Sequence, residues 1–151
     1  MADPVSHDPP LKGQCLCGAV TICLERAKPG VDVCHCDMCR QWTGGPLFSL
    51  HGVTKDDFTL EGEGAVRSYR SSEWAERASC TECGSNLWYR FVPAGTFSFT
   101  AGLFALPADW GIGEQIFVDE MPPYAELAAE STRKTGAEVM AEAREGGYDI
   151  G

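Results

Sequence analysis

Near its N-terminus the chain reads Gly13-Gln14-Cys15-Leu16-Cys17-Gly18-Ala19-Val20-Thr21-Ile22-Cys23-Leu24. Val20, Ile22 and Leu24 alternate with Thr21 and Cys23, which is the pattern of a half-buried β-strand. Gly18 lies between the cysteine pair and this strand, where it supplies the turn. The stretch therefore combines a candidate metal-binding turn with a strand that has one buried face.

Seven of the eight cysteines fall into three tight clusters. After Cys15-Leu16-Cys17 come Cys34-His35-Cys36-Asp37-Met38-Cys39 and Cys80-Thr81-Glu82-Cys83. Zinc takes four thiolates where it stabilises a fold, and usually three protein ligands plus an open position where it does chemistry. Seven thiols therefore predict two zinc ions per chain, one in a closed site and one in an open site. The predicted ligands are Cys15, Cys17, Cys80 and Cys83 for the closed site, and Cys34, Cys36 and Cys39 for the open one.

The turn from Cys80 to Gly84 is a strong zinc signal, because both sulfurs of a Cys-x-x-Cys-Gly turn can point at one ion. Cys15 and Cys17 can complete the tetrahedron if the first strand pairs beside the strand that enters Cys80. Such a link would hold distant parts of a sheet together, so we expect a structural role for this site.

The three cysteines from Cys34 to Cys39 can hold one face of an ion and leave a position for water, for His35 or for an incoming thiolate. Zinc lowers the pKa of a bound thiol, so an open site of this kind suits chemistry at sulfur. The alternative is a second structural site closed by His35 or Cys23. Cys23 is more typical of a core residue, and His35 would point away from the metal in an extended segment.

Arg40 directly follows the second cluster and is our candidate for contact with a cofactor or substrate. Its guanidinium could bind a substrate carboxylate in a bidentate manner. The alternative is that Arg40 only caps a short helix. His7 and His51 have no partner pattern and receive no role.

The composition predicts a single globular body with many turns. The chain has 151 residues, of which 17 are Gly and 9 are Pro, and 44% are hydrophobic. Its net charge of −10 argues against nucleic acid, because zinc modules that bind DNA or RNA carry a basic face. No apolar run is long enough to cross a membrane, and the first residues show no leader pattern, so we expect a cytoplasmic protein. In a reducing compartment these cysteines are metal ligands rather than disulfide partners.

Strand signals predict a mainly β, antiparallel fold with short helices and a C-terminal helical tail. Residues 1–10 are expected to form a flexible lead, residues 11–125 the zinc-binding domain, and residues 126–151 the tail. A short helix is expected over Met38–Trp42, and a helix interrupted near Gly136 is expected within Glu126–Arg144. The predicted strands cover 19–24, 31–33, 47–53, 58–61, 65–70, 86–91, 96–100 and 115–118.

Three motifs in this order carry a resemblance to a known family. They are Gly13–Val20, Cys34–Arg40 and the stretch Cys80-Thr81-Glu82-Cys83-Gly84-Ser85-Asn86-Leu87. Together with the closing segment Ile116–Tyr124, they resemble the glutathione-dependent formaldehyde-activating enzymes, a family that includes centromere protein V. The resemblance covers about residues 11–125.

This resemblance implies a β-tent fold with a structural zinc on Cys15, Cys17, Cys80 and Cys83, and a catalytic zinc on the three-cysteine cluster. It also implies a carbon–sulfur lyase that joins glutathione and formaldehyde to S-hydroxymethylglutathione, or reverses that reaction. Our leading hypothesis is therefore a zinc-dependent lyase acting on adducts of a small thiol, such as glutathione, with an aldehyde. The alternative is a non-catalytic zinc module that binds a protein partner or a thiol ligand. A homodimer is a further arrangement that we consider.

Overall fold

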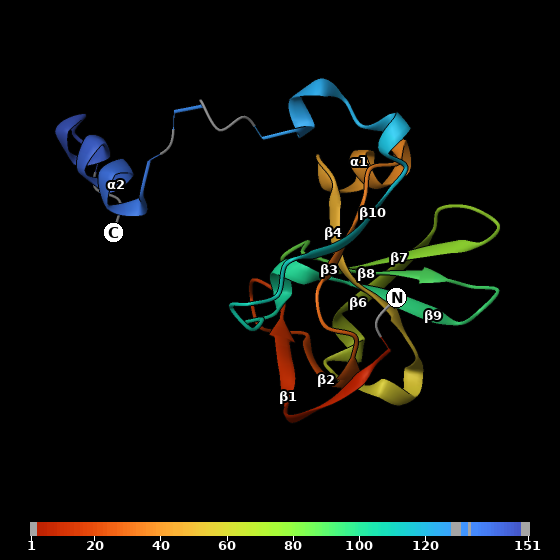
Figure 1. Cartoon of the computed structure of the whole chain (residues 1–151). Helices are drawn as coiled ribbons and strands as arrows, with labels where there is room; N and C mark the ends of the chain where they lie inside the picture. Colours follow the sequence, from red (N-terminus) through yellow and green to blue (C-terminus); the bar gives the residue numbers. More distant parts are fainter. Residues whose placement is uncertain (1–2, 128–130, 133, 149–151) are drawn as a thin grey trace. The chain divides into compact units, whose positions relative to one another are not determined.

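Residues 3–127, 131–132 and 134–148 are described by the computed structural model, which divides into two units, Met1–Met121 and Pro122–Gly151 (Figure 1). The first unit holds ten strands and a short helix, α1 (Asp37–Thr43), and the second holds helix α2 (Gly136–Glu145). The predicted mainly β class is therefore confirmed. The strands are β1 (Val5–Gln14), β2 (Thr21–Ala27), β3 (Val31–Cys34), β4 (Leu47–Val53), β5 (Phe58–Glu61), β6 (Val66–Arg70), β7 (Ala75–Cys80), β8 (Asn86–Phe91), β9 (Thr96–Thr100) and β10 (Ile112–Ile116).

The strands form two sheets. One has three strands in the order β1-β2-β5, and the other has seven in the order β10-β3-β4-β9-β8-β7-β6. All neighbours are antiparallel except β10 and β3, which run parallel. This arrangement confirms the predicted antiparallel pairing for most of the body.

The hydrophobic core joins the two sheets. Ile22 and Leu24 of β2 are fully buried, as their alternation predicted, and they belong to the same core cluster as Leu50 of β4 and Phe99 of β9. Phe99 packs edge-on against Trp88, with ring centroids 5.8 Å apart. Because side chains alternate between the faces of a strand, the neighbours of these core residues project from the other face of the large sheet.

Strand β1 begins earlier than the sequence predicted. Regular structure was expected from about Leu11, after a flexible lead, but Val5 already pairs with Ala27 of β2. The Nε2 atom of His7 lies 3.1 Å from the carbonyl oxygen of Ala27, and its ring packs against Trp110 with centroids 5.6 Å apart. These long-range contacts, which the polar and proline-rich composition does not reveal, explain the difference.

Two elements near the C-terminus also differ from the prediction. The strand expected over residues 115–118 is β10, Ile112–Ile116, and it is followed by the 3-10 turn Val118–Glu120. The helix expected within Glu126–Arg144 is α2, which starts after Thr135; residues 128–130 and 133 of that range lie outside the described residues. The Thr135 hydroxyl accepts a hydrogen bond from the Glu138 amide, and this cap determines where α2 begins. The boundaries proposed at residues 10 and 125 remain predictions.

No helix in the described part of the chain has the length and apolar character that a membrane span requires.

Candidate metal centres and substrate pocket

The cysteines that were predicted to act together do lie together. The sulfur atoms of Cys15, Cys17, Cys80 and Cys83 all lie within 4.8 Å of one another, and so do those of Cys34, Cys36 and Cys39. His35 and Cys23 belong to neither group. Either group could hold a metal ion.

The four-cysteine cluster matches the size of a zinc tetrahedron. The sulfur of Cys17 lies 3.6 Å from that of Cys15 and 3.8 Å from that of Cys80. A tetrahedron with zinc–sulfur bonds of about 2.3 Å has edges of about 3.8 Å. These two separations are therefore close to those of a tetrahedral zinc site.

The route by which these four cysteines meet differs from the prediction. The sequence suggested that they meet if the first strand pairs beside the strand that enters Cys80. That first strand is β2, which pairs with β1 and β5 in the small sheet, whereas β7 lies between β6 and β8 in the large one. The four-cysteine cluster therefore joins the two sheets to each other. A hydrogen bond from the Leu16 amide to the Ser85 hydroxyl, 3.0 Å long, supports the same junction.

The three-cysteine cluster is built where β3 passes into α1. Cys34 ends β3, Cys36 caps α1, and Cys39 lies inside the helix. The Cys36 sulfur accepts a hydrogen bond from the Cys39 amide at 3.3 Å, so the helix cap itself orients one sulfur. Cys39 is buried, whereas Cys34 and Cys36 are half-buried, which leaves the cluster accessible from one side.

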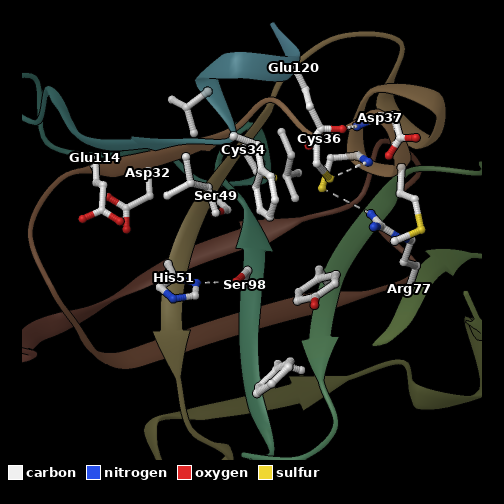
Figure 2. Close-up of a pocket in the computed structure, with 18 of the residues that line it drawn as sticks. Asp32, Cys34, Cys36, Asp37, Ser49, His51, Arg77, Ser98, Glu114 and Glu120 are labelled. Carbon is white, nitrogen blue, oxygen red and sulfur yellow. Dashed lines mark hydrogen bonds between the residues drawn. The ribbon is translucent and has the colours of Figure 1, made fainter. Parts of the chain in front are cut away.

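The cluster opens into a cavity of about 430 Å³ on the face of the large sheet opposite the core (Figure 2). Alternate residues of the central strands form its floor, among them Ser49 and His51 of β4 and Ser98 of β9. Among the described residues, the buried polar or charged ones are His35, Ser49, Arg77 and Ser98, and the last three line this cavity. Polar groups on a face that would otherwise be apolar are typical of a binding site.

Arg77 of β7 connects the sheet to the three-cysteine cluster. Its side chain is buried, with 5% of the residue exposed, and Nη1 lies 3.6 Å from the sulfur of Cys39 (Figure 2). The Nε atom donates to the hydroxyl of Ser71 at 3.2 Å, and the guanidinium packs over the rings of Trp42 and Tyr89. A buried cation in this position stabilises negative charge on the sulfur.

The protons of the three-cysteine cluster are distributed unequally in the metal-free chain. A hydrogen bond from Cys34, together with the nearby charge of Arg77, lowers the pKa of Cys39 to about 6, although burial opposes this change. The same hydrogen bond and burial raise the pKa of Cys34. Cys39 is therefore the first of these two thiols to become a thiolate, as a metal ligand must.

Arg40 and His35 belong to the same segment as the three cysteines, but neither is among the residues that line the cavity. Arg40 donates a hydrogen bond through Nη1 to the carbonyl oxygen of Glu120 at 3.0 Å, and its contact with a substrate remains a prediction. His35 is buried, and its Nε2 lies 2.9 Å from the side-chain oxygen of Gln115. This pair attaches the β10 segment to the start of the cysteine cluster, so His35 supports the site rather than lying at the surface.

Sequence reasoning missed several residues of the pocket, namely Arg77, Ser49, His51, Tyr89 and Ser98. The signal that could have found Arg77 is its position in the strand Ala75-Glu76-Arg77-Ala78, where alanines on both sides indicate burial. Trp74 also lines the cavity.

Comparison with known proteins places this architecture in a family. Residues 10–120 match the family described as glutathione-dependent formaldehyde-activating enzyme. The chain belongs to that family, and a relative that is named as a lyase supports a lyase-like activity.

Two individual proteins show the extent of the similarity. An uncharacterised lyase of Schizosaccharomyces pombe is 30% identical over 133 residues, which cover 87% of this chain and 96% of that protein. A crystal structure of a Rhodobacter sphaeroides protein superimposes with a TM-score of 0.52 at 19% identity, covering 68% of this chain and 99% of that one. The second likeness supports the fold alone.

Proposed function

We propose that this protein is a zinc-dependent carbon–sulfur lyase that makes or breaks the bond between a small thiol and an aldehyde carbon. The observation that carries the proposal is the three-cysteine cluster, which is accessible from one side and opens directly into the cavity. Membership of the formaldehyde-activating family supports the same reaction class. Glutathione and formaldehyde are the first pair to test.

Each residue group has a distinct role in this proposal. Cys34, Cys36 and Cys39 would hold a catalytic zinc, and the fourth position would face the cavity. Cys15, Cys17, Cys80 and Cys83 would hold a structural zinc between the two sheets. A zinc bound to the three-cysteine cluster would keep a substrate thiol in its thiolate form at neutral pH.

The reaction needs one bond to form and one proton to move. In the forward direction the substrate sulfur bonds to the carbonyl carbon, the π electron pair moves to the oxygen, and the proton lost by the thiol ends on that oxygen. In the reverse direction the carbon–sulfur bond breaks and the hydroxyl proton returns to sulfur. Arg77 would hold Cys39 as a thiolate throughout, and the walls of the cavity would exclude bulk water from the reacting atoms.

Nuclear magnetic resonance exchange spectroscopy with isotopically labelled formaldehyde can measure the rates of adduct formation and adduct breakdown at equilibrium. These rates are compared with the rates of the uncatalysed reaction. Catalysed exchange in protein that contains two zinc ions, and its loss in Cys36→Ser, would support the proposal. Cys23→Ser is a matched control because Cys23 belongs to neither cluster. The absence of exchange with every thiol tested would overturn it.

A non-catalytic module that binds a protein partner is the second candidate. The second unit exposes large apolar side chains, with Tyr124 70% exposed and Leu127 92% exposed. Exposed apolar groups of this kind can serve as partner anchors. A partner that is captured by the whole chain but lost on removal of residues 122–151, in protein without lyase activity, would favour this candidate.

A further inference from the structure

The charge of the cavity does not match the charge of glutathione. Four carboxylates line it, together with one guanidinium, that of Arg77; the carboxylates belong to Asp32, Asp37, Glu114 and Glu120. Three thiolates around one divalent ion would add a further negative charge. Glutathione carries two carboxylates and one ammonium group, so it would enter a cavity of like charge.

The single cation of the lining is directed toward the protein. Arg77 is buried, its Nη1 lies 3.6 Å from the sulfur of Cys39, and its Nε donates to Ser71. The guanidinium lies over the rings of Trp42 and Tyr89, at 5.0 and 5.2 Å from their centroids. These contacts compensate the charge of the cysteine cluster, so Arg77 does not make the cavity attractive to anions.

The carboxylates are only partly compensated. Asp32 forms an ion pair with Lys28 at 2.7 Å, and Arg40 lies against the backbone carbonyl of Glu120. Among the residues that the structure describes, no ion pair involves Glu114, Asp37 or Glu120. Figure 2 shows Asp32 and Glu114 on one side of the cavity and Asp37 and Glu120 on the other, so negative charge flanks the space in front of Cys34 and Cys36.

Exposed aromatic side chains also line the cavity. Trp74 is 47% exposed, Phe91 37% and Phe117 51%, and all three line the cavity. Aromatic faces attract organic cations, and ammonium groups on apolar bodies are bound by such walls in combination with carboxylates. Phe117 also has a φ of 56°, which is rare for a bulky residue and is found where other contacts hold the backbone.

We propose that the cavity selects thiols, and their aldehyde adducts, that carry an organic ammonium group on a short apolar body, in preference to glutathione. This inference rests on the proposed function, because it takes the three-cysteine cluster as the place where the substrate sulfur binds. The sulfur would lie at the cluster, the apolar body along the aromatic walls, and the ammonium group near Glu114 or Glu120.

A panel of three short thiols of different charge tests the proposal on zinc-loaded protein. Thiocholine is cationic and cannot close a ring with formaldehyde, 2-mercaptoethanol is neutral, and 3-mercaptopropionate is anionic; glutathione is the fourth compound. Binding is measured by calorimetry and turnover by exchange spectroscopy, both for the wild type and for the double variant Glu114→Gln/Glu120→Gln. Glu63→Gln is the matched control, since Glu63 is exposed and lies outside the cavity.

The expected result is tighter binding of thiocholine than of 3-mercaptopropionate or glutathione in the wild type. In the double variant, thiocholine should bind about fivefold to tenfold more weakly, the neutral thiol should be unchanged, and the anionic thiol should bind more tightly. Added salt should weaken thiocholine binding in the wild type more than in the variant. In the comparison of the wild type with the double variant each thiol is compared with itself, so differences in thiol acidity cancel and this comparison decides the charge selectivity.

Two failures can be told apart. The charge selectivity would be overturned if the double substitution changed the binding of all thiols equally, or if the wild type bound glutathione in preference to thiocholine. This holds even if the neutral thiol is turned over. If no thiol is turned over, including the neutral one, the proposed lyase function fails, while the calorimetric comparison still decides the charge selectivity.

Discussion

The guanidinium of Arg77 lies 3.6 Å from the sulfur of Cys39, in a buried position on β7, the strand next to one edge of the large sheet. Arg77 is the only cation among the cavity-lining residues that the structure describes, and it connects β7 to the cluster at the junction of β3 and α1. The sheet therefore contributes to the electrostatics of a centre whose candidate ligands all lie on another part of the chain.

Arg77→Met should weaken metal binding at the three-cysteine cluster about tenfold to a hundredfold, the range seen when a group supporting a ligand is lost. Methionine keeps much of the apolar volume but removes the charge beside Cys39. Competition with a chromophoric chelator measures the affinity, and Arg67→Met on the exposed part of β6 is the control. Unchanged affinity in Arg77→Met would show that the contact is not electrostatically important.

The lowered pKa of Cys39 predicts how the chain responds to pH when the three-cysteine cluster holds no metal. The pKa of Cys39 in the folded chain, about 6, lies below the ordinary thiol pKa. The Cys39 thiolate therefore stabilises the fold fully at a pH above the ordinary thiol pKa, and this contribution is lost as the pH falls through about 6. The urea midpoint of protein that keeps its structural zinc but holds no metal at the three-cysteine cluster should therefore rise from about pH 6 toward the ordinary thiol pKa of about 8.5. Cys39→Ser should reduce this rise, and an equal slope in both proteins would contradict the prediction.

The two cysteine clusters should respond differently to single substitutions. Cys80→Ser should lower the melting temperature strongly, because the binding free energy of a structural zinc, on the order of 10 kcal/mol, is available only to the folded chain. Cys36→Ser should remove one metal equivalent with a smaller loss of stability, because its cluster does not join the two sheets. Metal analysis and thermal unfolding measure both effects, with Cys23→Ser as the control. Equal destabilisation by the two substitutions would argue against the division into a structural and an accessible site.

Gly62→Ala should reduce the free energy of unfolding by at least about 2 kcal/mol. Gly62 has a φ of 86°, and a Cβ atom there would lie 1.8 Å from the backbone oxygen of Ala19, beside the four-cysteine cluster. Gly64→Ala is a matched control, since a Cβ atom at Gly64 would meet no atom within 4 Å. Denaturant unfolding of both variants measures the difference, and equal stability would contradict the close approach.

Arg40→Gln distinguishes two roles of Arg40. If Arg40 anchors a substrate carboxylate, the substitution should weaken only carboxylate-bearing thiols, by about tenfold. If it chiefly holds the segment that carries Glu120, through the 3.0 Å hydrogen bond to that carbonyl, neutral and anionic thiols should be weakened alike. Binding isotherms for neutral and anionic thiols separate the two, and we expect the uniform loss because the guanidinium already binds the Glu120 carbonyl.

Much of the local structure could be predicted from the sequence. The strands over residues 47–53, 58–61, 86–91 and 96–100 have the predicted bounds, because alternation and turn residues act over short distances. The grouping of Cys34, Cys36 and Cys39 was equally predictable, since three ligands within six residues can reach one ion whatever surrounds them.

The sequence by itself determined the cysteine clusters, the mainly β class and the family, because these depend on residue types at close spacing. Only the tertiary structure decided that the Cys15 and Cys80 pairs meet by packing of two sheets rather than by pairing of their strands. Only the tertiary structure placed Arg77 against Cys39 and surrounded the cluster with carboxylates and aromatic rings. The physical reason is that such contacts join residues from separate strands, and the order of strands in a sheet is set by the burial of a shared core, which local patterns do not encode.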